Sequence, residues 1–131
     1  MKAEGGVNGR REPEDIEERT LAYAVRAVRL FQALQRREDR AGWIVGKQFL
    51  RAATSIGANV AEARSGETRR DFVHKLQVAQ KEARESLYRL MLLERTALLP
   101  PDRLSHLVRE TDEIVAILTT IIRKAKRPAA D

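Results

Sequence analysis

The chain has 131 residues, a formal net charge of +6 and no cysteine; 34% of its residues are charged and 5% are aromatic. This length suffices for one domain with its own core, and the composition favours helices over strands. The absence of cysteine excludes a disulfide framework, a thiolate metal site and a cysteine nucleophile. The polar N-terminal segment does not resemble a signal peptide, and no apolar run approaches the roughly 18 residues of a membrane span. We therefore expect a soluble cytoplasmic protein without a membrane partner.

The first predicted elements are a tail and a helix. Residues 1–12 contain three glycines among polar neighbours and are expected to be disordered. A helix is expected over about residues 14–37, starting near Pro13 and ending before Gly42, which we interpret as the helix breaker. Its main stripe repeats at steps of three and four residues and comprises Ile16, Thr20, Tyr23, Ala27, Leu30 and Leu34. A second stripe beside it comprises Leu21, Val25, Val28 and Phe31.

The second helix is expected over about residues 43–64, with Gly57 in its interior, where a close backbone approach or a slight kink would explain a glycine. Its apolar face comprises Phe49, Ala52, Ile56 and Val60. Ser55, Asn59 and Glu62 form a polar row that overlaps this face. Buried polar groups need partners, so the row is predicted to bond to a neighbouring helix or subunit. In one interpretation Asn59 is a hydrogen-bonded amide of the core and Glu62 a carboxylate at its edge. In the other, the row fixes the register of the helices and the number of subunits.

The third helix is expected over about residues 68–98, with Thr68 and Asp71 as a variant of the capping box. Two prolines end it, and a fourth helix follows over about residues 102–126. The stripe of the third helix comprises Phe72, Leu76, Ala79, Ala83, Leu90 and Leu93. The fourth helix has two stripes, one of Leu104, Val108, Thr111, Val115, Leu118 and Ile122, and one of Leu107, Ile114 and Ile121.

Two stripes on one helix are wider than a single packing partner requires, which predicts burial of the fourth helix in a subunit interface. Four helices with short connections predict an all-α fold, an antiparallel up-and-down four-helix bundle over residues 13–127. We expect this bundle to assemble into a homo-oligomer and to be followed by a C-terminal tail at residues 128–131.

The positive charge is unevenly placed along the chain. Residues 14–40 are balanced, and the excess lies at the end of the second helix, the start of the third and the end of the fourth. Clustered Arg and Lys attract nucleic acid, although cations at a helix C-terminus are also typical of a solvated surface. The candidate nucleic-acid-binding residues are Arg64, Arg69, Arg70, Arg123, Lys124, Lys126 and Arg127.

One segment resembles a known family. Ser55-Ile56-x-x-Asn59-x-Ala61-Glu62, followed by Phe72, is similar to the core of four-helix-bundle proteins encoded in intervening sequences of large-subunit ribosomal RNA genes. Many members have Pro where Gly57 stands and Gly where Ala63 stands, so the bend of the second helix is expected to differ here. The resemblance covers roughly residues 15–125 and also rests on Gln48, Arg51, Val60, Leu76, Ala79, Glu82 and Glu85.

The resemblance implies a homopentamer of four-helix bundles with no established enzymatic activity. A related branch, the accessory variability determinants of diversity-generating retroelements, has a similar fold and pentameric state. Those proteins bind nucleic acid through a basic surface and work with a reverse transcriptase. The partners implied are therefore further copies of the chain, RNA or DNA, and a reverse transcriptase. In a pentamer each basic patch would occur five times, which increases avidity.

Enzymatic interpretations rest on fewer residues. Arg69-x-x-x-x-His74 is similar to the motif of metal-independent ribonucleases of the HEPN superfamily, in which His transfers a proton and Arg stabilises the phosphate. Asp71 and His74 lack the second pair and the further carboxylates of a di-iron bundle. The segment 42–47 is one residue short of a phosphate-binding loop, and Gln48 replaces the required Ser or Thr. We expect no enzymatic activity, metal or cofactor; a ribonuclease and a purely structural oligomer remain the alternatives.

Overall fold

The computed structural model describes residues 12–96 and 99–127, which form four α-helices and, over these residues, no strand. The helices are α1 (Glu12–Gln35), α2 (Arg40–Arg64), α3 (Arg69–Arg95) and α4 (Pro101–Lys126). The prediction of an all-α fold with four helices is confirmed. The predicted tails lie outside the described residues, except for Glu12, which opens α1.

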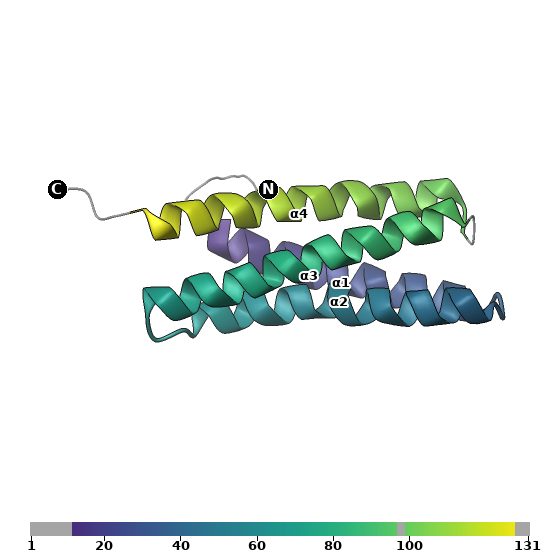
Figure 1. Cartoon of the computed structure of the whole chain (residues 1–131), viewed down its shortest axis with the longest axis horizontal. Coiled ribbons are helices and arrows are strands. Elements are labelled where there is room, and N and C mark those ends of the chain that lie inside the picture. Colours follow the sequence, from purple (N-terminus) through teal and green to yellow (C-terminus); the bar gives the residue numbers. More distant parts are fainter. Residues whose placement is uncertain (1–11, 97–98, 128–131) are drawn as a thin grey trace, which may run out of the picture.

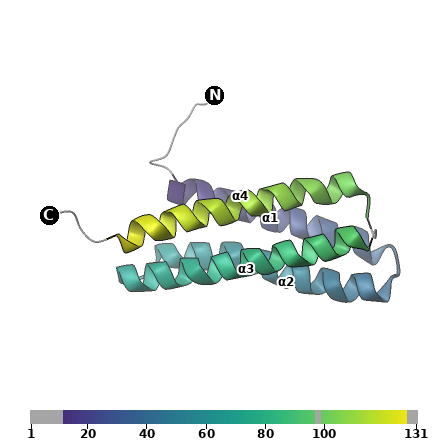
Figure 2. The ribbon, with the colours of Figure 1, turned by 45° about the horizontal axis from the view of Figure 1, so that its top comes forward.

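The helices are arranged as a ring in which α1 packs against α2, α2 against α3, α3 against α4, and α4 against α1. In Figures 1 and 2, each helix runs back along the one before it. The start of α1, the end of α2, the start of α3 and the end of α4 therefore lie at one end of the bundle, on the left in Figure 1. Over the described residues, no helix has a stretch that is both long and apolar enough to cross a membrane.

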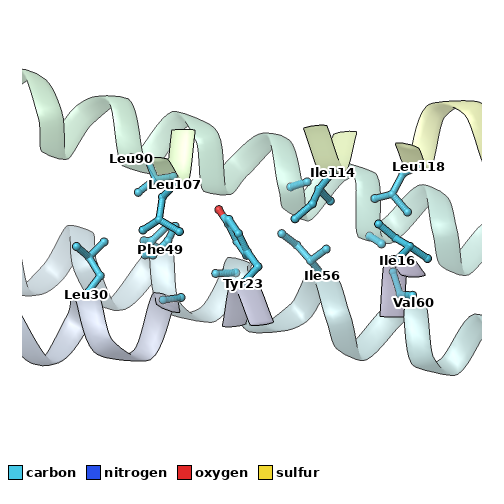
Figure 3. Packing of buried hydrophobic residues seen from close by; sticks show 14 of the residues in the cluster. Ile16, Tyr23, Leu30, Phe49, Ile56, Val60, Leu90, Leu107, Ile114 and Leu118 are labelled. Carbon is cyan, nitrogen blue, oxygen red and sulfur yellow. The ribbon is translucent and has the colours of Figure 1, made fainter. Parts of the chain in front are cut away.

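The core consists of the apolar stripes facing one another along the bundle axis (Figure 3). All six residues of the main α1 stripe are buried, as are the four residues of the α2 face. On α3, Phe72 is half-buried and the remaining predicted residues are buried. Both stripes of α4 lie largely within the bundle, because α4 contacts α1 on one side and α3 on the other. Contacts with two neighbouring helices of the same bundle therefore explain the two α4 stripes, and the predicted burial of α4 in a subunit interface is not needed.

A buried polar layer crosses the middle of the bundle. Tyr23 of α1, Ser86 of α3 and Thr111 of α4 are each fully buried, and Tyr23 Oη lies 2.6 Å from Thr111 Oγ1. Thr111 Oγ1 donates to the carbonyl oxygen of Leu107 at 2.6 Å, so its one proton is used and the Tyr23 hydroxyl donates to it. Phe49 of α2 packs edge-on against Tyr23 with 6.4 Å between ring centroids. α1, α3 and α4 thus each contribute a polar side chain to this layer, and α2 contributes the Phe49 ring beside it.

The connection between α1 and α2 corrects one prediction. Gly42, which was predicted to end the first helix, lies instead in the first turn of α2. Its amide donates a hydrogen bond to Asp39 Oδ1 at 2.7 Å. Asp39 is the N-cap, and α2 begins at Arg40, three residues earlier than expected. The chain instead turns at Glu38, which has a left-handed φ of 53°. The left-handed Glu38 thus ends the turn after α1 and the N-cap Asp39 starts α2, and neither step requires a glycine.

The start of α3 follows the predicted signal, whereas its end does not. Thr68 caps α3 by accepting a hydrogen bond from the Asp71 amide at 3.0 Å. α3 ends at Arg95 with Thr96 as its C-cap, before the two prolines that were predicted to end it. Residues 97–98, the last two of the predicted helix, lie outside the described residues. α4 starts at Pro101, where the missing amide hydrogen is not needed.

Gly57 marks a close approach of α1 and α2, the first of the two explanations that its position in the helix left open. A Cβ at this residue would lie 3.3 Å from Thr20 Oγ1 and 3.4 Å from the Thr20 carbonyl oxygen. Because a backbone oxygen cannot rotate away as a side chain can, glycine lets the two helices pack closely at this level.

Ion pairs connect neighbouring helices across three of the four helix–helix interfaces, which we call seams. Arg19 of α1 reaches Glu110 of α4 through two nitrogens at 2.8 and 3.1 Å, and Glu113 at 2.6 Å. Its pKa is raised chiefly by the hydrogen bond to Glu110, despite partial burial. The other pairs are Arg64 with Glu17 at 3.2 Å, Arg51 with Glu85 at 3.2 Å, and Lys75 with Glu62 at 2.7 Å. The α3–α4 seam has no ion pair among the described residues, and there the candidate site lies.

Candidate anion-binding groove

An open groove with a volume of about 620 Å³ lies along the seam between α3 and α4. Among its described lining residues, four side chains are cationic and none is a carboxylate. Arg84 comes from α3, whereas Arg123, Lys126 and Arg127 come from the last turn of α4 and the residue after it. The other lining residues are Gln77, Gln80, Thr119 and Ile122. We call this set the α3–α4 groove.

Helical spacing brings these side chains together. Arg123, Lys126 and Arg127 are three and four residues apart, so they share one face at the end of α4. Gln77, Gln80 and Arg84 follow one another at steps of three and four residues on α3, so they also share one face. The two helices pack directly against each other, so these two faces meet at the seam. The groove is thus built from segments about 40 residues apart in sequence.

The floor of the groove is polar in one part and apolar in another. Gln80 Nε2 donates to Thr119 Oγ1 at 2.7 Å, and Thr119 Oγ1 donates to the carbonyl oxygen of Val115 at 2.8 Å. Ile122 is buried beside them. This hydrogen bond fixes the two helices below the cations without using any of their charge.

None of the four groove cations forms an ion pair with another described residue. By contrast, Arg19, Arg51 and Arg64 on the other three seams each face a carboxylate. Like charges that converge without counterions repel one another, and a bound anion would relieve that repulsion. The electrostatics of the groove therefore favour a negatively charged ligand.

The helix dipole accounts for only part of this arrangement. Cations in the last turn of a helix are favoured by its negative end, which suits Arg123 and Lys126. Arg84 lies in the middle of α3, where the dipole gives no such advantage. Its presence in the groove was not predicted from the sequence, because an isolated Arg on a charged helix carries no signal of its own.

The predicted basic residues gather at one end of the bundle, but only some of them line the groove. Arg123, Lys126 and Arg127 do, whereas Lys124, two residues from Lys126, does not. Arg64 lies across the bundle and pairs with Glu17. The other two, Arg69 and Arg70, are exposed at the start of α3 and are also outside the groove lining.

The predicted polar row is half-buried to exposed and bonds mainly within α2. Ser55 Oγ donates to the carbonyl oxygen of Arg51 at 2.8 Å, and Asn59 Nδ2 donates to that of Ser55 at 2.8 Å. Glu62 pairs with Lys75 of α3 at 2.7 Å. Only Glu62 therefore reaches a neighbouring helix, and the two shorter side chains use their own backbone instead.

The residues of the ribonuclease alternative do not share a site in the described structure. His74 lines a shallow depression at the α2–α3 turn with Glu62, Glu67, Asp71 and Lys75, and Arg69 is not part of it. Five residues along a helix correspond to a rotation of about 140° around its axis, which separates Arg69 from His74. No group of three His, Asp or Glu side chains in residues 12–96 and 99–127 is placed to hold a metal ion.

A second basic hollow lies on the α1–α4 seam, lined by Arg26, Arg29, Arg103 and His106 with two leucines. Its volume is about 190 Å³, less than a third of that of the α3–α4 groove. None of these residues was predicted as a binding residue. Because this hollow is smaller and lacks hydrogen-bonding amides, the α3–α4 groove is the stronger candidate.

The chain is similar to known proteins over most of its length. The model of the 23S rRNA-intervening sequence protein family matches residues 15–120. Among solved structures, a protein of unknown function from Bacteroides thetaiotaomicron, of the S23 ribosomal protein family, shares 36% sequence identity with a TM-score of 0.78. That match covers 86% of this chain and 98% of the other. No curated protein matches the chain.

Proposed function

The chain belongs to the 23S rRNA-intervening sequence protein family, as its segment from Ser55 to Phe72 predicted, and on that premise we propose that it is a non-enzymatic scaffold that binds nucleic acid. One observation carries this proposal: four cations converge on the α3–α4 groove, and none of the lining residues that the structure describes is a carboxylate. Guanidinium groups bind phosphate oxygens through paired hydrogen bonds, and lysine adds a mobile point charge.

A polymer suits this groove better than a small anion. Arg84, Arg123, Lys126 and Arg127 are all exposed, so water and salt weaken the attraction of each to a single phosphate. A nucleic acid presents phosphates at regular intervals and releases counterions as each is neutralised. Its affinity therefore comes from several weak contacts, which an open groove along a helix seam permits.

We further propose that the scaffold is a homo-oligomer, with five copies as the resemblance implies. The second stripe of α1 supports self-association: Leu21 is 64% exposed, and Val25 and Val28 lie on the same outward side. An apolar stripe of this kind is a candidate contact surface. A pentamer would carry five times the +6 of one chain and would present bound nucleic acid to an enzyme such as a reverse transcriptase.

Salt-dependent binding tests the nucleic-acid proposal. Labelled RNA and DNA hexanucleotides would be titrated with the protein by fluorescence anisotropy at several salt concentrations. Four phosphate contacts predict a slope of about −2.8 for log K against log salt with single strands. Arg84→Gln and Lys126→Gln should each weaken binding and reduce the steepness of that slope by about 0.7.

Arg109→Gln is the matched control, because Arg109 is exposed on α4 and is not part of the groove lining. It should leave the slope unchanged. Equal losses in all three variants would mean that net charge rather than the groove attracts the strand, and no binding by the unmodified protein would refute the proposal. Light scattering on the same sample would decide between five times the 14.9 kDa chain mass and a smaller assembly.

A further inference from the structure

The α3–α4 groove continues along the outer side of α3 as a second shallow hollow. This hollow has a volume of about 400 Å³ and is lined by Lys81, Arg84, Glu85, Tyr88 and Arg89. Arg84 lines both hollows, so they adjoin at this residue. A strand whose phosphates occupy the groove would reach the outer hollow by passing Arg84.

The outer hollow is also cationic, although it contains a carboxylate. Glu85 Oε1 accepts a hydrogen bond from Arg51 of α2 at 3.2 Å, so its charge is compensated from the other side of α3. Lys81, Arg84 and Arg89 have no carboxylate partner among the described residues. The outer hollow therefore has a net positive charge.

Tyr88 differs from the other large aromatic residues of the described chain. Tyr23 and Phe49 are fully buried, and Trp43, at 42% exposed, has Lys47 Nζ 5.0 Å above its ring. Tyr88 is 61% exposed. The Arg89 guanidinium lies 5.5 Å from its ring centroid and can cover only one of the two ring faces. Tyr88 thus offers a flat aromatic surface to a ligand.

The spacing of Arg84 and Tyr88 suits a nucleotide. The two residues are four apart on α3, so they lie on one side of the helix, about 6 Å apart along its axis. A phosphate held by Arg84 would leave the attached base near the ring of Tyr88. Cationic residues next to an exposed aromatic ring are the elements with which proteins hold single strands without sequence preference.

We propose that this outer hollow is a base-stacking subsite and that the protein selects single-stranded nucleic acid over duplex. The unpaired base stacks on Tyr88 while its phosphates follow Arg84 into the groove. A duplex keeps its bases stacked inside and presents only phosphates, so it gains nothing from Tyr88. Because the phosphates must occupy the groove first, this subsite rests on the proposed function.

Single-stranded and duplex oligonucleotides of the same sequence, compared by fluorescence anisotropy at one salt concentration, test this selection. The unmodified protein should bind the single strand more tightly. Tyr88→Leu removes the ring but keeps an apolar side chain with good helix propensity, and should weaken single-strand binding by about 5- to 100-fold. Tyr88→Phe keeps the ring and should bind as the unmodified protein does. Neither variant should change duplex binding.

The outcomes separate the two proposals. If Arg84→Gln weakens binding but Tyr88→Leu does not, the groove holds phosphate and the stacking subsite is wrong. If Tyr88→Leu weakens single-strand and duplex binding equally, selection by stacking is also wrong. If the unmodified protein binds neither form, both the function and the subsite are refuted.

Discussion

Replacing Tyr23 with Phe would remove the hydroxyl group from the buried polar layer without changing the ring that packs against Phe49. Thr111 would keep its hydrogen bond to the carbonyl oxygen of Leu107, so no buried donor loses its partner. Only the bond of 2.6 Å between Tyr23 and Thr111 would be lost. We therefore expect Tyr23→Phe to lower the free energy of unfolding by about 1 kcal/mol near neutral pH.

Alkaline pH should reverse this order of stability. Burial raises the pKa of Tyr23 to about 12. The ordinary pKa of a tyrosine is about 10. Because the folded state disfavours the ionised phenol, the contribution of Tyr23 is intact below about pH 10 and is lost as pH rises toward about 12. Each pH unit in that window removes about 1.4 kcal/mol from the unmodified protein only.

The stabilities of the two proteins should therefore become equal near about pH 11, and the variant should be the more stable above it. Urea unfolding followed by circular dichroism from about pH 8 to about pH 12 would measure the difference. Other titrating groups are common to both proteins and cancel. Tyr88→Phe is the control for hydroxyl removal, and near neutral pH it should change stability by less than about 0.5 kcal/mol because Tyr88 is exposed. A stability difference between Tyr23→Phe and the unmodified protein that stays constant across this pH range would refute the proposed burial of the phenol.

Four further substitutions test packing, charge and backbone conformation by the same urea assay. Gly57→Ala should lower the free energy of unfolding by about 1 kcal/mol, since the added methyl group meets the α1 backbone; a gain would show that the helices are not in close contact there. Arg19→Ala should cost about 2 kcal/mol because it strands the Glu110 carboxylate, which is 14% exposed, while Lys75→Ala, whose partner Glu62 is 60% exposed, should cost less than about 1 kcal/mol; equal losses would contradict this difference in burial. Glu38→Gly should raise the free energy of unfolding by about 0.5 kcal/mol by relieving its left-handed backbone, and a loss would contradict that conformation.

The core was predictable because helical periodicity depends on local sequence alone. The α1 stripe from Ile16 to Leu34 repeats every three or four residues and is buried throughout. Ser86 was missed although it occupies the gap in the α3 stripe between Ala83 and Leu90. Serine is mostly an exposed residue, so the pattern gave no reason to place Ser86 in the core. Its Oγ is buried and has no hydrogen-bond partner among the described residues.

The stripes of α1 and α4 show that the width of a helix's apolar surface does not by itself predict a subunit interface. Both helices carry two apolar stripes, and the sequence predicted a subunit interface for α4. The structure buries the second α4 stripe inside the bundle and leaves the second α1 stripe exposed, with Leu21 at 64%. The residues of an apolar stripe do not show which neighbouring helix will cover it. The covering neighbour depends on how each helix is rotated about its axis within the ring.

The α3–α4 groove could be predicted only in part, because a run of basic residues does not specify a face. Neighbours in a run diverge by about 100° per residue around a helix, so Lys124 falls outside a groove that Arg123 and Lys126 line. Arg84 joins them from another helix. The salt dependence of binding a dodecanucleotide, which has enough phosphates for either set of contacts, separates the two descriptions. Contacts from all seven predicted residues would give a slope of about −4.9, whereas the four groove cations give about −2.8. A measured slope near the larger value would mean that the basic end of the bundle acts as a diffuse charge, and the groove would then have no special role.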